Sequence, residues 1–251
     1  MNGVAPILQV EHLSKAFGGL QALSQIDFAL EDREIVCLIG PNGSGKTTLF
    51  NLITGFLRPD SGRIVFMGKD IAGLKPHRIC YQGIARTFQL VKPFSDLTVL
   101  QNVMSGRLYG PNSASNLREA MTDAERILDF TGLLSKKMAK AGSLTLPDRK
   151  RLEVARALAT KPKLLLLDEI MAGLNSKEIE DAVLLARRIR DSGTTLMVVE
   201  HVLKAVMGIS DRIIVLDVGQ KIAEGSKQEV VRNKRVIEAY LGQETPSTHR
   251  I

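Results

Sequence analysis

A glycine-rich stretch from Gly40 to Thr48, GPNGSGKTT, has the residue types and spacing that phosphate binding requires. It matches the pattern G-x-x-x-x-G-K-[ST] and connects the apolar run EIVCLI to the helix-like run LFNLITGF. Glycines let the backbone close around phosphate oxygens, with N–H groups and a helix N-terminus pointing at them. Lys46 would neutralise the β- and γ-phosphates, and the Thr47 hydroxyl would bind Mg²⁺. The expected nucleotide contacts are Asn42, Gly43, Ser44, Gly45, Lys46, Thr47 and Thr48.

Two adjacent carboxylates end a second apolar run, LLLLDE, from Leu164 to Glu169. At the end of a strand, Asp168 can hold Mg²⁺ through water, and Glu169 can polarise an attacking water. Side chains of neighbouring residues project differently, so two separate roles are expected. A core strand that simply meets solvent would have the same sequence, but the phosphate-binding stretch upstream favours the functional interpretation.

Three further polar residues occur where side chains that sense the γ-phosphate are expected. Gln89 in GIARTFQ precedes the helical stretch and His201 in MVVEH follows a predicted buried strand, positions compatible with strand ends near the phosphates. Asn175 lies in the loop after the two acids. His201 could hydrogen-bond the γ-phosphate and help to orient water. Each of these residues taken alone would be an ordinary exposed polar residue, so the interpretation depends on the motifs around it.

The elements that must position these residues are visible as apolar, β-branched runs bounded by turn residues. Several runs are apolar at consecutive positions, as expected for strands covered on both faces, and helical stretches separate them. Between Asp96 and Thr160 the periodicity is helical. We therefore expect an α/β fold with a mainly parallel sheet and an inserted α-helical subdomain. The strand-like runs are ILQV, IDFAL, EIVCLIG, RIVFMG, KLLLLDE, TTLMVVE and RIIVLD.

The composition is that of a soluble globular protein expected to form one domain, since 44% of its 251 residues are hydrophobic. The α/β core would comprise residues 1–95 and 161–242, the helical subdomain 96–160, and a loose tail 243–251. No apolar run reaches membrane-spanning length, and the N-terminus does not resemble a signal peptide. The net charge of +7 is dispersed and aromatic residues make up only 4%, which argues against a nucleic-acid footprint.

The two cysteines also bear on the cellular compartment. Cys37 lies inside an apolar run and far along the chain from Cys80. This placement favours core thiols in a reducing cytosol over a disulfide or a metal site.

The order of the motifs, with GIARTFQ, LTLPDRKRLEVARAL, LLLLDE and AGLN between the phosphate-binding stretch and His201, resembles the ATP-binding subunits of ABC transporters. The resemblance covers nearly the whole chain, from about Ile7 to Gly242. More narrowly, KAFGGLQAL, LTVLQNV, VMGISDRIIVLDVGQ and VIEAYLG are similar to subunits that power branched-chain amino acid importers. The resemblance implies a P-loop NTPase core with N-terminal antiparallel β strands, and ATP and Mg²⁺ as cofactors.

The resemblance also implies a role for each motif residue. Phe17 would stack on adenine, and Asp168 would be the magnesium aspartate. Glu169 would be the catalytic base and His201 the switch histidine. Gln89 would bind the magnesium ion and couple the γ-phosphate to the membrane subunits.

The segment LTLPD departs from the LSGGQ signature of this family, whose helix points at the γ-phosphate of ATP held by the other subunit. Thr145 keeps a hydroxyl, whereas Leu146 and Pro147 replace the two glycines. Leucine is bulky and disfavours positive φ, and proline removes one N–H donor although it suits the first helical position. Asp148 is expected to place a negative charge where a phosphate should approach. We therefore interpret LTLPD as a retained structural position with an altered phosphate contact.

Two smaller departures follow the acids. Asn175 in AGLN stands where an aspartate is usual, in the loop that would cross between two ATP sites. Ile170 replaces the usual proline, and the sequence offers no functional account of this change.

The unequal motifs predict an unequal pair of ATP sites. In the family, each ATP lies between one chain's P-loop and the other chain's signature. A heterodimer with a sister ABC ATPase is therefore expected, with a weak reciprocal site. Further implied partners are two transmembrane permease subunits near VKPFSDLTVLQNV and, indirectly, a periplasmic or extracellular solute-binding protein, but no nucleic acid. The implied location is peripheral, at the cytoplasmic face of the inner membrane.

Other functions stay open at this point. The same subunit could drive import of an amide or urea-type solute, because it does not contact the transported molecule. A non-transport ABC ATPase usually carries a long coiled coil or two fused halves, neither of which occurs here. LTLPD would permit an ATP-dependent clamp without turnover, but Glu169 and His201 argue against that. A small-molecule P-loop kinase would leave Gln89 and the LTLPD helix unexplained.

Overall fold

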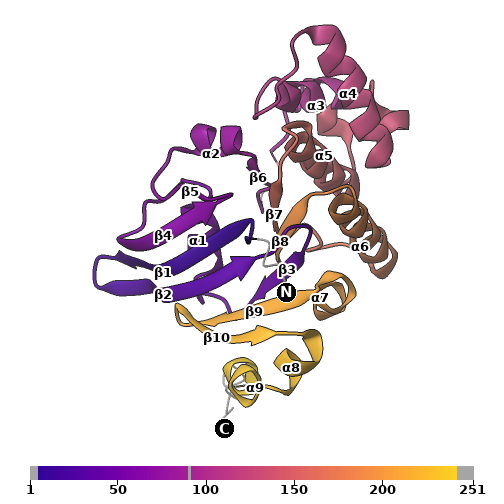
Figure 1. Ribbon diagram of the computed structural model, residues 1–251. Coiled ribbons are helices and arrows are strands. Elements are labelled where there is room, and N and C mark those ends of the chain that lie inside the picture. The colour runs from indigo at the N-terminus through magenta and orange to yellow at the C-terminus, as the bar shows by residue number, and fades with distance from the viewer. Residues whose placement is uncertain (1–4, 90–91, 242–251) are drawn as a thin grey trace.

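Two β-sheets form the centre of the computed structural model, which describes residues 5–89 and 92–241 (Figure 1). The larger sheet has the strand order β10-β9-β3-β8-β7-β6. Every neighbouring pair is parallel except β9 and β10, which confirms the mainly parallel sheet. Its strands are β3 (Ile35–Ile39), β6 (Ile84–Arg86), β7 (Leu164–Asp168), β8 (Thr195–Val199), β9 (Arg212–Asp217) and β10 (Gln220–Gly225).

The strands β6 and β10 at the two edges of this sheet are not among the predicted strands. β6 has only three residues, and β10, QKIAEG, has no fully buried residue. An edge strand packs against fewer neighbours, so its sequence need not carry an apolar run.

The smaller sheet is antiparallel, with the order β2-β1-β4-β5, and confirms the expected N-terminal antiparallel strands. Together with α1 (Lys46–Ile53) it covers one face of the larger sheet, and a continuous apolar cluster fills the space between them. The strands are β1 (Leu8–Phe17), β2 (Leu20–Leu30), β4 (Ser61–Phe66) and β5 (Lys69–Asp70).

The pleat of β3 explains its uninterrupted apolar sequence. Val36 and Leu38 point into the cluster with α1, whereas Ile35, Cys37 and Ile39 point into a second cluster on the opposite face. The helices α6 (Ser176–Asp191) and α7 (Leu203–Ile209) cover that second face. Cys37 is fully buried, and burial raises its pKa to about 12, in agreement with the predicted core thiol.

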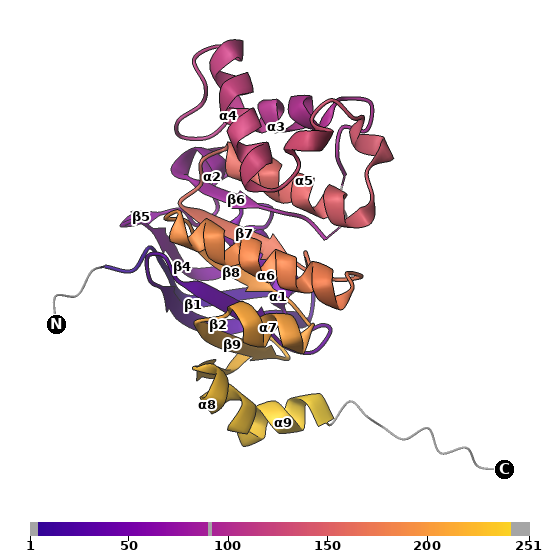
Figure 2. The same cartoon turned by 90° about the vertical axis from the view of Figure 1, so that its right-hand side faces the viewer.

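The helical region lies at one end of the sheets (Figure 2). It contains α3 (Val99–Arg107), α4 (Leu117–Phe130) and α5 (Leu146–Ala159), which pack on a third apolar cluster. None of the strands above falls within residues 96–160, all of which the structure describes. Between β5 and β6, α2 (Pro76–Gln82) begins at a proline, which is compatible with the first turn of a helix.

The last described elements, α8 (Lys227–Arg232) and α9 (Lys234–Leu241), pack beside β10. The predicted tail, 243–251, lies outside the described residues, and the division of the chain into core and helical subdomain stays a prediction. No helix among the described residues has the length and apolar character needed to span a membrane.

Candidate functional site

The phosphate-binding stretch forms the turn between β3 and α1. Gly45 precedes α1 with a φ of 104°, and a Cβ atom at this position would lie 2.7 Å from the carbonyl oxygen of Ala22. Both the backbone conformation and the packing therefore require glycine. Gly43 has a φ of 80° and no neighbouring atom within 4 Å of where a Cβ would lie, so a phosphate can approach its backbone. The first N–H groups of α1 receive no side-chain cap and suit an anion.

Lys46 lies inside this loop. Its Nζ atom donates to the carbonyl oxygens of Gly40 and Pro41, each at 2.8 Å. Burial lowers the pKa of Lys46, while the nearby charges of Asp168 and Glu169 act in the opposite direction. The structure therefore brings the predicted cation close to both predicted acids, although they follow it by more than a hundred residues.

Asp168 ends β7 and forms a buried ion pair with Arg86 of β6, a residue that the sequence motifs did not identify. Arg86 Nη2 donates to Asp168 Oδ2 at 2.7 Å, and Nη1 donates to Asn51 Oδ1 at 2.6 Å. Its guanidinium carbon lies 5.4 Å and 5.3 Å from the ring centroids of Phe50 and Phe88. The two charged side chains are only 6% and 7% exposed. A buried arginine requires an anionic partner. The arginine in GIARTFQ was therefore the one signal in the sequence that could have indicated this ion pair.

Glu169 brings two distant predicted residues together. Gln89 Nε2 donates to Glu169 Oε2 at 2.7 Å, and His201 Nδ1 lies 4.0 Å from Glu169 Oε1. Glu169 itself has a φ of 49°, and its N–H donates to the carbonyl of Val199 at 2.9 Å. The two adjacent acids thus point to different partners, as their proposed roles require.

The segment LTLPD forms the start of α5. Thr145 is the N-cap, Leu146 is the first helical residue and Pro147 the second, one position later than expected. The Thr145 hydroxyl does not cap the helix but donates to Asp148 Oδ2 at 2.8 Å, and Lys136 Nζ bonds the same oxygen. Leu146 is 48% exposed.

These contacts correct the expectation for Asp148. Burial raises its pKa, but the hydrogen bonds from Lys136 and Thr145 outweigh this effect and hold the pKa below its ordinary value. The carboxylate is ionised at neutral pH, yet it is not a free charge aimed at a phosphate, because Lys136 neutralises it.

A family model described as ABC transporter matches residues 23–172 of the chain. The chain belongs to this family. A second model, described as branched-chain amino acid ATP-binding cassette transporter, matches residues 220–245. The solved structures of two ABC cassettes are also similar. The ADP conformation of MJ1267 is 34% identical with a TM-score of 0.86, covering 96% of this chain and 100% of that one. The cassette cbiO1 from Clostridium perfringens is 28% identical with a TM-score of 0.82, covering 96% of each chain.

Curated relatives of this ABC ATPase match over almost their entire length. The high-affinity branched-chain amino acid transport ATP-binding protein LivG of Salmonella typhimurium is 41% identical, over 95% of this chain and 98% of that protein. BraF of Pseudomonas aeruginosa, with the same description, is 39% identical over the same shares. The probable branched-chain amino acid transport protein LivG of Archaeoglobus fulgidus is 39% identical, over 94% and 95%.

The remaining predicted residues of this ABC ATPase occupy varied positions. Phe17 ends β1, is 46% exposed and has Lys15 Nζ 5.6 Å from its ring centroid. Asn175 is the N-cap of α6 and accepts from the N–H groups of the next turn, which any aspartate there could also do. Ile170 is 8% exposed and packs in the second apolar cluster, which accounts for an apolar side chain there. In the phosphate-binding loop, Asn42 and Thr47 are exposed, Thr48 is half-buried and Ser44 is buried.

Proposed function

We propose that this ABC ATPase powers the import of branched-chain or related amino acids across the cytoplasmic membrane. The match of residues 220–245 to the branched-chain amino acid cassette model, together with relatives about 40% identical over nearly their full lengths, supports the solute class. The observation that carries the enzymatic part is the convergence of Gln89, His201 and Glu169 at the carboxyl ends of neighbouring strands.

The donor set fits Mg²⁺ and ATP. Asp168 uses Oδ2 for Arg86, and its Oδ1 accepts no hydrogen bond from any described residue, so one carboxylate oxygen is available. Thr47 and Gln89 add the oxygen donors that Mg²⁺ prefers. When bound, Mg²⁺ neutralises charge on the β- and γ-phosphates. Lys46 contributes a second positive charge to the same phosphates.

Glu169 is placed to act as the base. Its Oε2 is held by Gln89, which leaves Oε1 to accept a proton from water. His201 Nδ1, 4.0 Å from that oxygen, can hold the same water or the γ-phosphate in line. Gln89 thus joins the catalytic carboxylate to the segment that precedes the helical region.

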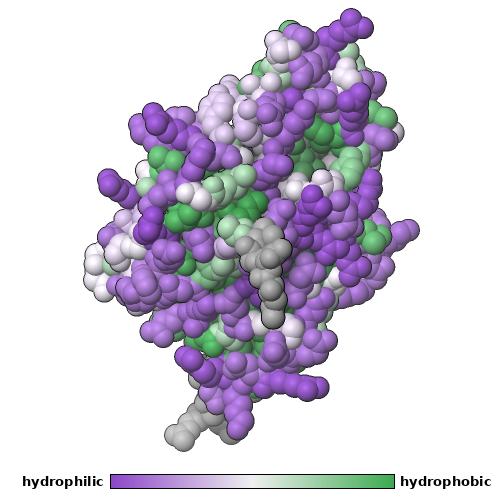
Figure 3. Space-filling view, in the orientation of Figure 1, coloured by the Kyte–Doolittle hydropathy of each residue, from purple (hydrophilic) through white to green (hydrophobic). Residues whose placement is uncertain are grey.

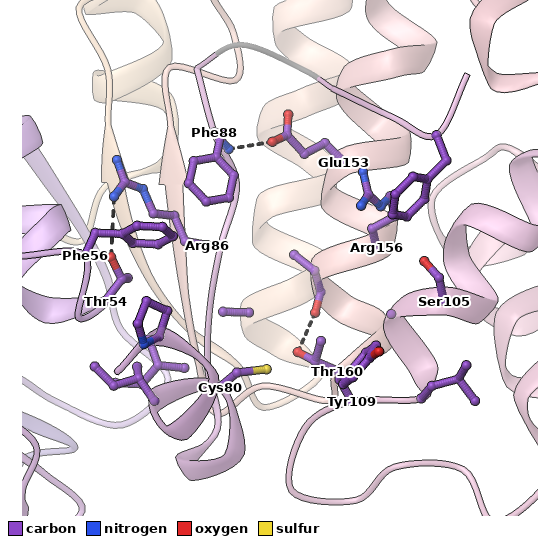
Figure 4. Close-up of a pocket in the computed structure, with 18 residues that line it drawn as sticks. Thr54, Phe56, Cys80, Arg86, Phe88, Ser105, Tyr109, Glu153, Arg156 and Thr160 are labelled. Atoms are coloured by element: carbon purple, nitrogen blue, oxygen red, sulfur yellow. Dashed lines mark hydrogen bonds between the residues drawn. The ribbon is translucent and has the colours of Figure 1, made fainter. Parts of the chain in front are cut away.

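A groove of about 510 Å³, lined in part by Phe88, supports the permease assignment (Figure 4). It runs between β6, α2, α3 and α5, and exposed aromatic rings line it, among them Phe56, Phe88, Phe94 and Tyr109. The outer surface in the view of Figure 3 is mainly hydrophilic, with hydrophobic side chains in separate patches. An apolar groove with aromatic walls suits a short helix from a membrane subunit. Phe88 faces this groove and also stacks on Arg86, so docking there is linked to Asp168.

The dimer is proposed to be asymmetric. This chain presents the P-loop, both acids, Gln89 and His201, whereas its signature segment carries leucine and proline in place of two glycines. The site on this chain's P-loop would use the sister's signature, and the reciprocal site would turn over slowly.

The test is the ATPase rate of the chain alone, with a candidate sister, and in the complete complex with permease subunits. Glu169→Gln is expected to lower kcat about a thousandfold in the complex while ATP binding persists, because only the proton acceptor is lost. Glu180→Gln is a matched control, since Glu180 is an exposed acid of α6 paired with Lys204. Its kcat should equal that of the wild type.

Two outcomes would contradict the proposal. Rapid hydrolysis by the isolated chain at both sites of a homodimer would exclude the asymmetric pair. ATP-dependent uptake of urea or an amide, but not of leucine, by vesicles containing the complete complex would exclude the amino-acid assignment.

A further inference from the structure

Two buried charged side chains hold the main chain around Glu169 and have no part in the reaction above. Lys150 of α5 donates from Nζ to the carbonyl oxygen of Glu169 at 3.0 Å. Glu200, directly after β8, accepts from the N–H of Met171 at 2.7 Å through Oε1. The residues Lys150 and Glu200 are 8% and 1% exposed. Both contacts are to the backbone, so they act on the position of Glu169 rather than on ATP.

The backbone of Glu169 is in a conformation that needs such support. Its φ of 49° lies in the left-handed region, which is sterically unfavourable for a residue other than glycine. Its N–H is fixed by Val199, its carbonyl by Lys150, and the turn that follows by Glu200. Two of these bonds come from the consecutive residues Val199 and Glu200 at the end of β8, and the third comes from α5. The direction of the catalytic carboxylate therefore depends on two separate elements, β8 and α5.

The charges of the pair support each other. Burial lowers the pKa of Lys150, and the charges of Glu200, Glu153 and Glu169 oppose this shift. Burial raises the pKa of Glu200, and the N–H of Met171 and the charge of Lys150 oppose it. The second oxygen of Glu200, Oε2, is buried and accepts no hydrogen bond among the described residues. A buried lysine and an incompletely paired carboxylate are costly for stability alone, so a task in positioning explains them better.

The helix that carries Lys150 also carries the signature segment. Leu146 and Lys150 are four residues apart on α5, and they lie on the same side of the helix, one turn from each other. A shift of this helix when its N-terminus meets a phosphate is passed directly to the carbonyl of Glu169. The same helix thus presents its N-terminus to the sister's ATP and, one turn further along, holds the main chain of this chain's base.

We propose that Lys150 is a positioning residue that transmits engagement of the LTLPD segment with the sister's ATP to Glu169, while Glu200 holds the turn that follows Glu169. This inference rests on the proposed function, because it requires ATP sites shared between two subunits. Transmission through Lys150 gives the altered LTLPD signature a function even if the ATP site to which LTLPD contributes turns over slowly. An LTLPD segment that binds phosphate weakly still reports its presence through α5.

The experiment uses the complete complex and compares Lys150→Met, Lys150→Arg and Arg151→Met. Lys150→Met should lower kcat about tenfold or more with KM for ATP changed less than about twofold, because positioning of the base is lost and binding is not. Lys150→Arg should restore most of the rate. Arg151→Met is the matched control, since Arg151 is the next residue and pairs with Asp181 on α6. It should leave kcat unchanged.

A double-mutant cycle separates transmission from simple support. Leu146→Gly alters the signature contact and should change kcat at this chain's own P-loop site when Lys150 is present, but not in the Lys150→Met background. Glu200→Gln removes the buried charge but keeps an oxygen that accepts from the N–H of Met171. This substitution should reduce the effect of Leu146→Gly on kcat. A purely structural role for Lys150 would make the effects of Leu146→Gly and Lys150→Met additive, and that result would overturn the inference.

The outcomes distinguish this inference from the proposed function. Wild-type kcat in Lys150→Met, in a complex whose ATPase Glu169→Gln abolishes, would overturn the inference and leave the function standing. A complex with no ATPase that depends on Glu169 would instead overturn the function.

Discussion

The P-loop side and the signature side of this chain handle polar groups in opposite ways. At the start of α1, glycine conformations leave backbone N–H groups open, and Lys46 donates to two carbonyls and the Ser44 hydroxyl of its own loop. At the start of α5, the Thr145 hydroxyl, the Asp148 carboxylate and the Lys136 ammonium satisfy one another. Both helix N-termini lack a side-chain cap, so both retain some attraction for an anion. The two ends thus differ in backbone access, and the charges at the start of α5 are neutralised within the chain.

The largest expected effect concerns the buried charges of the P-loop side. Arg86→Met should lower the free energy of unfolding by about 3 to 5 kcal/mol, because Asp168 is left as a buried charge without its partner. The exposed pair of Arg63 with Asp70 provides the control, and Arg63→Met should cost less than about 1 kcal/mol. Urea unfolding of the isolated chain measures both. Equal losses in the two variants would show that the Arg86 pair is not the organising contact of this side.

The second effect is a pH dependence of stability that originates at Glu200. Burial raises its pKa to about 7 from an ordinary 4.5, against the opposing N–H of Met171 and charge of Lys150, with Glu169 adding to the rise. The folded state therefore holds a proton that the unfolded state releases between these values. Stability of the wild type relative to Glu200→Gln should fall as pH rises from about 4.5 to 7, by up to about 3 kcal/mol.

The measurement is the difference in unfolding free energy between the two proteins at several values from pH 5 to pH 8. Glu180→Gln is the control of opposite sign. Its hydrogen bond from Lys204 lowers the pKa of Glu180, so its contribution is lost only as pH falls below the ordinary range. If the difference in unfolding free energy between the wild type and Glu200→Gln did not change with pH, Lys150 would compensate the charge of Glu200 fully.

The sequence predicts those features whose residues are neighbours along the chain, and it does not predict contacts between distant residues. The strands β3, β7 and β8 are buried at every position, and apart from Thr195 and Asp168 they carry apolar residues because both faces are covered. The phosphate-binding stretch is a single continuous motif. The partners Arg86 and Asp168 are 82 residues apart, and Lys150 reaches Glu169 across a gap of 19. No periodicity or spacing rule joins such pairs. The first pair follows from the parallel pairing of β6 with β7, and the second from the packing of α5 against β7.

The smallest expected effect concerns the signature side. The sequence predicts that Asp148 repels phosphate, whereas in the structure Lys136 bonds its carboxylate. In a complex whose own P-loop site is disabled by Lys46→Ala, Lys136→Met should raise the Kd for ATP at the remaining site about fivefold, or roughly 1 kcal/mol. Lys137→Met is the matched control, because Lys137 is equally half-exposed but pairs with Glu125. Adding Asp148→Asn to Lys136→Met should restore the affinity, since the uncompensated charge is then removed. If Asp148→Asn does not restore binding, the weak affinity of this site is due to Leu146 and Pro147 alone. Lost access to the backbone, and not charge, would then set the affinity for ATP.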